Sequence, residues 1–190
     1  MEEKMWAELQ NDVADTIVKA DDLWDQTIVN SINSSWNSVD GTGIIVTVAD
    51  TGLDSGTNDS TMHADFRDHI VDVVSWGMSA SDASSCGSPA DDGAADIDGH
   101  GTHVAGSVLG DGTNSSGNIK GIAPEARLYF QAIGVYCNSA GKTTLQGLPP
   151  DYTQLFKAGA ENGSRVHTNS WGSSVDGEYT IGSMQADRSA

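Results

Sequence analysis

Short apolar runs separated by polar, glycine-rich stretches set the pattern of this chain. Residues 44–49, Ile-Ile-Val-Thr-Val-Ala, form a continuous run rich in β-branched side chains, which is typical of a strand buried on both faces. Similar runs predict three further strands, at residues 70–76, 127–133 and 165–169. Helical spacing of small and apolar residues predicts helices at residues 100–109 and 152–162. Strands that alternate with helices require parallel crossovers, so the pattern predicts an α/β fold with a parallel sheet flanked by helices.

The first 40 residues are polar, with only scattered apolar positions. We expect one or two short surface helices there, packed on a body that starts at Gly41-Thr-Gly43. The chain therefore divides into an N-terminal segment, residues 1–40, and the start of a main domain, residues 41–190. Two stretches rich in polar residues and glycine are expected to be loops, at residues 77–99 and 110–117.

Charge and composition exclude several classes of partner. Acidic residues outnumber basic ones 27 to 9, and the formal net charge of −18 argues against nucleic acid or an anionic membrane surface. No apolar run approaches the roughly 18 residues of a membrane span, and the start of the chain does not resemble a signal peptide. The acidity suits a high-salt setting or a calcium-bearing exported protein without choosing between them. Cys86 and Cys137 lack the spacing of a metal site, which leaves a disulfide in an oxidising compartment or two free thiols.

Three segments carry side chains that could take part in catalysis, and each lies at one end of a predicted strand or helix. Asp50 comes directly after the first strand, His100 opens a helix, and Ser170-Trp171-Gly172 follows the last strand. The carboxyl ends of parallel strands meet at one edge of a sheet, so these segments should converge there. A carboxylate next to a buried strand is costly unless it is paired, and an imidazole at a helix start can exchange protons near neutral pH.

Two other kinds of site fit the same residues poorly. Aspartic proteases use two Asp-Thr-Gly segments, and this chain has one. His100 and His103 lie near Asp96 and Asp98, which could suggest a metal site. Helical zinc sites more often place two His four residues apart with a Glu between them, and no third ligand is evident.

The order of the motifs and the residues within them resemble those of one protease family. Asp50-Thr-Gly-Leu-Asp54, His100-Gly-Thr-His-Val-Ala-Gly106 and Asn169-Ser-Trp-Gly172 are similar to the successive signatures of the subtilisin-like serine proteases, the subtilases or peptidase family S8. Stretches such as Val166-His-Thr-Asn-Ser-Trp-Gly172 resemble the branch of oxidatively stable bacterial alkaline proteases. The resemblance implies a three-layer α/β fold and a secreted serine endopeptidase that acts on polypeptides, needs no cofactor for its chemistry and is a monomer when full length.

The resemblance also implies a role for each matched residue. Asp50 would be the carboxylate of the catalytic triad, and His100 would serve as general base and then general acid. Ser170-Trp171-Gly172 would line the specificity pocket and pair with extended substrate by strand addition. Asp96, four residues before His100, would order its loop or line a subsite; a solvated loop charge is the alternative.

The nucleophile of the family is missing from this sequence. The family carries it in Gly-Thr-Ser-Met-Ala, and the one similar stretch here, Gly182-Ser183-Met184, lacks the Thr and continues into polar residues, so Ser183 is not assigned as catalytic. The Ala-Gly-Asn context of the oxyanion-hole Asn is also missing. We therefore expect the N-terminal part of a truncated subtilase domain, inactive as a fragment. The alternative is a non-catalytic binding module built on a protease scaffold.

Structural calcium is the one cofactor that the resemblance suggests. Asp59, nine residues after Asp50, matches a position that binds calcium in some subtilisins. The loop at residues 110–117 offers further oxygen atoms of the kind that calcium prefers. A hydrated turn is the alternative for both segments.

Overall fold

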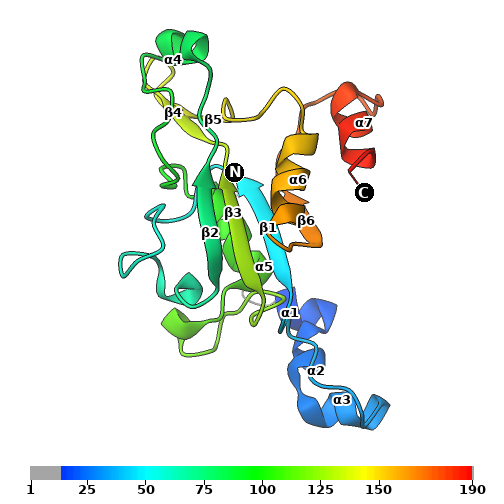
Figure 1. Cartoon of the computed structure of the whole chain (residues 1–190). Coiled ribbons are helices and arrows are strands. Elements are labelled where there is room, and N and C mark those ends of the chain that lie inside the picture. The colour runs from blue at the N-terminus through cyan, green and yellow to red at the C-terminus, as the bar shows by residue number, and fades with distance from the viewer. Residues whose placement is uncertain (1–13, 190) are drawn as a thin grey trace, which may run out of the picture.

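A four-stranded parallel sheet forms the centre of the computed structural model, which describes residues 14–189. The strands lie in the order β2-β3-β1-β6, a sequence order that requires crossovers (Figure 1). Their bounds are Ile45–Asp50 for β1, Ile70–Ser75 for β2, Arg127–Ala132 for β3 and Val166–Asn169 for β6. The predicted α/β fold with a parallel sheet is confirmed. Asp50 is the last residue of β1 rather than the first residue after it.

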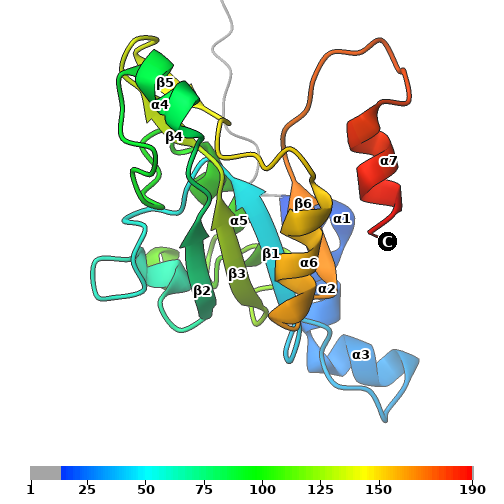
Figure 2. The ribbon, with the colours of Figure 1, turned by 45° about the horizontal axis from the view of Figure 1, so that its top comes forward.

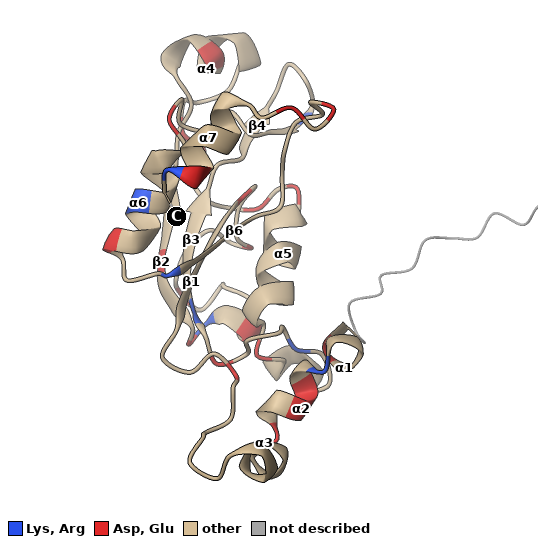
Figure 3. Cartoon of the chain, turned by 90° about the vertical axis from the view of Figure 1, so that its right-hand side faces the viewer, with Lys and Arg blue, Asp and Glu red and all other residues tan. Residues whose placement is uncertain are grey.

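Two helices cover opposite faces of this sheet and make the three layers (Figures 2 and 3). Helix α5, His100–Leu109, packs against the face that carries Val46 and Val48 of β1. Helix α6, Thr153–Glu161, packs through Leu155 against Ala49 on the other face. Side chains alternate along a strand, so β1 supplies buried residues to both layers. Both helices lie where the apolar spacing predicts them.

The described part of the N-terminal segment, from residue 14 on, contains three short helices: α1 Ala14–Val18, α2 Ala20–Trp24 and α3 Gln26–Ile32. They extend from the end of the sheet opposite the carboxyl ends of β1 and β3 (Figure 1). One link to the body is the hydrogen bond from Trp24 Nε1 to the carbonyl of Ile122, at 3.2 Å. The part of this segment before residue 14 lies outside the described residues. No described helix has the length and apolar character needed to cross a membrane.

The stretch at residues 77–99, expected to be a loop throughout, contains a helix, and this expectation was wrong. Helix α4 spans Ala80–Cys86; its N-cap Ser79 accepts a hydrogen bond from the Asp82 amide, and its C-cap Gly87 has φ 63°. Good caps at both ends stabilise a short helix whose composition alone favours a loop. The structure also contains elements for which no apolar run gave a prediction: a hairpin of β4 Val135–Cys137 and β5 Lys142–Thr144, helix α7 Ile181–Asp187, and 3₁₀ turns Ala64–Phe66 and Thr113–Ser115.

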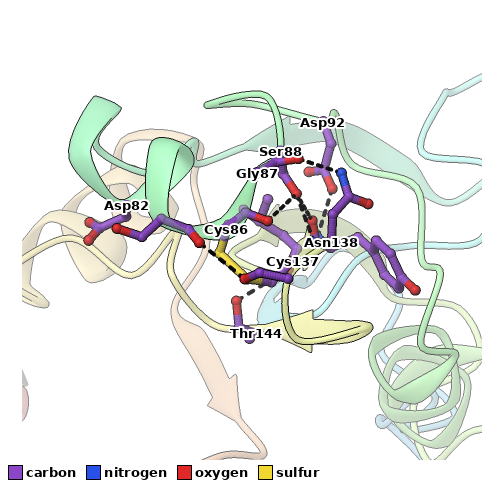
Figure 4. Close-up of a disulfide and its surroundings, with 12 residues drawn as sticks. Asp82, Cys86, Gly87, Ser88, Asp92, Cys137, Asn138 and Thr144 are labelled. Atoms are coloured by element: carbon purple, nitrogen blue, oxygen red, sulfur yellow. Dashed lines mark hydrogen bonds between the residues drawn. A yellow bond between two sulfur atoms is a disulfide. The ribbon is translucent and has the colours of Figure 1, made fainter.

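Helix α4 and the hairpin form a small lobe beyond the carboxyl ends of β2 and β3, and a disulfide joins them (Figure 4). The bond links Cys86, the last residue of α4, to Cys137, the last residue of β4. The amide of Ser139 donates to the Cys86 carbonyl at 2.9 Å, and Ser88 Oγ donates to the Tyr136 carbonyl at 2.7 Å. We call this unit, residues 79–92 and 135–144, the disulfide lobe.

A buried polar cluster lies between the sheet and α6. Gln131 of β3, which is fully buried, accepts a hydrogen bond from Trp76 Nε1 at 2.9 Å and donates to the Leu155 carbonyl at 3.0 Å. Its amide nitrogen also lies 3.3 Å from Nε2 of His167. An amide nitrogen only donates, so His167 Nε2 accepts and must be unprotonated. Burial lowers the pKa of His167 from 6.5 to about 4, partly offset by the Leu155 carbonyl.

This low pKa predicts that the fold loses stability in mild acid. In the unfolded chain His167 binds its proton near pH 6.5, whereas in the folded chain it does so only near pH 4. The contribution to stability is therefore complete above pH 6.5, falls as the pH drops, and is lost below the folded pKa, for a total of about 3 kcal/mol. We expect the pH dependence of urea unfolding between pH 7 and pH 4 to be shallower in His167→Gln. The exposed His103→Gln is the matched control, and equal slopes in wild type and His167→Gln would contradict the prediction.

Candidate active site

Asp50 and His100 form a direct hydrogen bond at the carboxyl end of the sheet. Nδ1 of His100 lies 2.7 Å from Oδ1 of Asp50. A carboxylate oxygen accepts, so Nδ1 carries the proton and Nε2 of a neutral imidazole keeps its lone pair. Asp50 is 1% exposed, whereas the His100 side chain is 45% exposed. A buried acid therefore orients an imidazole whose other side is open to solvent.

Electrostatics at this pair favour a charged imidazole. The hydrogen bond to Asp50 raises the pKa of His100 above 6.5, burial opposes it, and the negative charges of Asp50, Asp98 and Asp96 add to the increase. Asp50 Oδ1 also accepts from the amide of Thr51 at 2.7 Å. Its buried Oδ2 accepts from none of the residues that the structure describes. Such an arrangement stabilises an imidazolium formed during proton transfer.

Glycine explains how α5 comes so close to the end of β1. A Cβ on Gly101 would collide with the carbonyl oxygen of Gly52 and lie 3.1 Å from Cβ of Asp50. Gly99, the N-cap, has φ 88°, in the left-handed region that glycine adopts readily. The two glycines that flank His100 therefore let the first turn of the helix contact the turn after Asp50.

Asp96 orders the loop before α5. Its Oδ1 accepts from Thr51 Oγ1 at 2.8 Å and from the Gly99 amide at 2.9 Å. Its Oδ2 accepts from the amide and the hydroxyl of Thr102, at 2.8 and 2.6 Å. These contacts agree with the expected role of Asp96 in ordering its loop and not with a solvated charge. Sequence reasoning missed Thr51 and Thr102, although each stands directly inside one of the motifs.

The segment Ser170-Trp171-Gly172 lies at the same end of the sheet, as expected from its place after β6. Trp171 Nε1 donates to the carbonyl of Ala49 at 2.8 Å, and its ring meets that of Tyr152 edge-on with centroids 5.6 Å apart. Ser170 and His100 both line one groove of about 770 Å³, whose walls are mostly apolar side chains from α2, β1, α5, β6 and the loops beside them. Asp50, His100 and this segment are therefore brought together.

Other candidate residues lie elsewhere. Ser183 is at the start of α7, where it forms a capping box with Thr180, and α7 packs on α6, on the opposite side of the sheet from α5 (Figure 3). Asp59 Oδ1 accepts from the amide and hydroxyl of Thr61, at 2.8 and 2.6 Å. The loop at residues 110–117 contacts Asp65, through the Asn114 amide, rather than Asp59. Within residues 14–189 no group of three His, Cys, Asp or Glu could hold a metal ion, and structural calcium stays a prediction.

Comparison with known proteins gives a family match and several relatives. The model of the Subtilase family matches residues 41–189. The chain is 33% identical over 153 residues to the serine protease/ABC transporter B family protein tagB of Dictyostelium discoideum, covering 73% of this chain and 7% of that protein. It is 33% identical over 112 residues to the major intracellular serine protease of Bacillus subtilis (strain 168), covering 59% of this chain and 27% of the relative. Over 113 residues it is 31% identical to subtilisin of Bacillus sp. (strain TA39), covering 58% of this chain and 23% of the relative. The chain thus spans less than a tenth of the Dictyostelium protein and about a quarter of the bacterial ones.

Proposed function

The chain belongs to the subtilase family of serine proteases, and from this premise we propose that it carries the Asp and His of a serine endopeptidase whose nucleophile lies outside these 190 residues. The observation that carries the proposal is the hydrogen bond of 2.7 Å between the buried Asp50 and the half-exposed His100. A binding module has no chemical need for an imidazole that a buried acid orients.

The proposed mechanism follows from this geometry. Asp50 holds the proton on Nδ1 of His100, so Nε2 can accept the proton of a serine hydroxyl and later give it to the leaving amine. The pKa of His100 is raised by Asp50, which helps the imidazole hold that proton between the two steps. Ser170-Trp171-Gly172 pairs with an extended polypeptide substrate through backbone hydrogen bonds.

The groove beside His100 supports the proposal that another segment of the protein supplies the nucleophile. Among the described residues two serines, Ser107 and Ser170, line this groove with His100. Ser107 Oγ donates to the His103 carbonyl at 3.0 Å within α5, and in the family the segment that holds Ser170 binds substrate. The apolar walls suit an apolar element that would carry a serine to the open side of the imidazole. The 190 residues alone are then inactive.

Several finer features belong to the same proposal. On the resemblance of its sequence motifs we assign the enzyme to the branch of oxidatively stable alkaline proteases, secreted and monomeric when full length, with polypeptides rather than nucleic acid as substrates. The disulfide between Cys86 and Cys137 supports an oxidising, extracellular location. Residues 1–40 would pack on the catalytic domain, and calcium would stabilise the fold without taking part in the chemistry.

Reading the gene beyond codon 190 tests the proposal. We expect an open frame that encodes an oxyanion-hole Asn and a Gly-Thr-Ser-Met-Ala segment. The protein expressed from that longer frame should hydrolyse casein, lose this activity with a serine-directed inhibitor, and lose it in His100→Ala. A stop codon directly after Ala190 would favour the binding module instead, and activity that survives His100→Ala would show that His100 is not the general base.

A further inference from the structure

One indole side chain anchors the segment that follows β6. Trp171 Nε1 donates to the carbonyl of Ala49 at 2.8 Å, and its ring meets the ring of Tyr152 edge-on with centroids 5.6 Å apart. Trp171 also packs against the buried cluster of Ala49, Ile133 and Leu155, on the face of the sheet that α6 covers. The side chain therefore holds the segment from the side opposite the groove that α5 lines.

The backbone on either side of this anchor has little other support. Ser170 and Gly172 are exposed, and so is every residue from 172 to 179, whereas Trp171 is partly buried. A Cβ built on Gly172 would meet nothing within 4 Å. Exposed backbone with few packing contacts opens at low cost in free energy. The position of the backbone at Ser170 and Gly172 thus depends on the side chain between them.

The same anchor sets the segment against the proposed catalytic carboxylate. Ala49, whose carbonyl accepts from the indole, directly precedes Asp50 in β1. The amide of Ile133, a residue of the same buried cluster, donates to the Asp50 carbonyl at 2.8 Å. Trp171 and Asp50 are therefore fixed to one small part of the core. A shift of about 1 Å between a bound substrate and the catalytic groups can cost on the order of 10²-fold in rate.

We propose that Trp171 is a positioning residue, whose indole N–H holds the backbone of Ser170 and Gly172 ready to pair with a substrate strand. The inference rests on the proposed function, which assigns substrate binding to this segment, and it deepens that function by naming the side chain that prepares the segment. Preorganisation raises affinity because less conformational freedom is lost on binding. The rival explanation is that Trp171 only fills the core, and its loss would then lower stability without a selective effect on peptide binding.

Peptide binding to the 190-residue chain tests this role without any turnover. The probe is acetyl-Ala-Ala-Val-Ala-amide, an uncharged peptide that can bind by strand addition, and the amide resonances of Ser170 and Gly172 are followed by NMR. The same peptide with N-methylated backbone amides cannot donate hydrogen bonds and should not bind. Trp171→Phe keeps a ring beside Tyr152 and loses the N–H. We expect this variant to bind the probe about fivefold more weakly, the value of one hydrogen bond, and to exchange its Ser170 and Gly172 amides faster with solvent.

Trp76→Phe is the matched control. Trp76 packs against the same buried cluster, and its Nε1 donates to Gln131 at 2.9 Å, so this variant loses an equivalent bond away from the substrate segment. It should lose a similar amount of stability in urea and keep wild-type peptide affinity and wild-type amide exchange at Ser170 and Gly172.

The two variants separate failure of this inference from failure of the proposed function. Wild-type peptide affinity in Trp171→Phe, or an equal loss of affinity in Trp76→Phe, would overturn the inference and leave the proposed function standing. If the probe shifts neither the Ser170 nor the Gly172 resonance in the wild-type chain, the segment does not bind substrate. The proposed function then loses its substrate site together with the inference.

Discussion

The 190-residue chain is expected to hydrolyse a chromogenic peptide about a million times more slowly than a complete subtilase. The magnitude is the one measured in subtilisin, a member of this family, when the nucleophilic serine is removed. Asp50 and His100 are in contact at 2.7 Å, but without a hydroxyl at Nε2 the imidazole can activate only water. On the proposed function the oxyanion-hole Asn also lies outside these residues, and its absence would remove a further factor on the order of 10²–10³, again a value from subtilisin.

The control for this experiment is His100→Ala. Turnover by the wild-type chain should be indistinguishable from that of the variant and from the buffer, measured over hours with micromolar protein. Turnover that is clearly above the buffer and disappears in His100→Ala would show that some other group serves as nucleophile. Ser170 would then be the first residue to test, because it lines the same groove as His100; Ser183, which forms the cap of α7, would be the second.

Elements with a long apolar repeat could be predicted from the sequence, because burial decides their structure. Residues 44–49 could hardly form anything but a strand covered on both faces, and β1 supplies side chains to both helix layers. The helix at His100 could be predicted for the same reason. Convergence of Asp50, His100 and Ser170 followed from a rule of topology: ligands gather at the carboxyl ends of parallel strands.

The parts that sequence reasoning missed depend on contacts between distant residues. Helix α4 has few apolar residues and is held by the cap at Ser79 and the disulfide at Cys86. The hairpin of β4 and β5 has strands of three residues each, too short to show a period. The network of Asp96 joins Thr51 to Thr102 across 51 positions of sequence, and no local pattern indicates such a contact.

Removal of the disulfide in Cys86→Ser with Cys137→Ser is expected to cost 2–4 kcal/mol of folding free energy. The cysteines are 51 residues apart, and the chain-entropy relation gives about 4 kcal/mol for a closed loop of this size. For a chain of this length the loss corresponds to a melting temperature lower by roughly 10 °C. Reduction of the wild-type protein with dithiothreitol should give the same shift and should leave the double variant unchanged.

The effect should be concentrated in the disulfide lobe, because its core is small. The buried residues of that core are Ala83, Cys86, Val135 and Cys137, together with Met78 directly before the lobe, so the two cysteines are a large part of it. Without the bond, amide hydrogen exchange should accelerate over residues 79–92 and 135–144 and stay slow in β1 and β3. Ser79→Ala is the milder comparison, since loss of a helix cap costs about 1 kcal/mol.

The root of the hairpin, Gly134, lies against the backbone of Thr51, directly after Asp50. A lobe that unfolds separately should therefore also perturb the His100 resonances. Uniform acceleration of exchange across β1 and β3 would instead mean that the lobe unfolds together with the sheet.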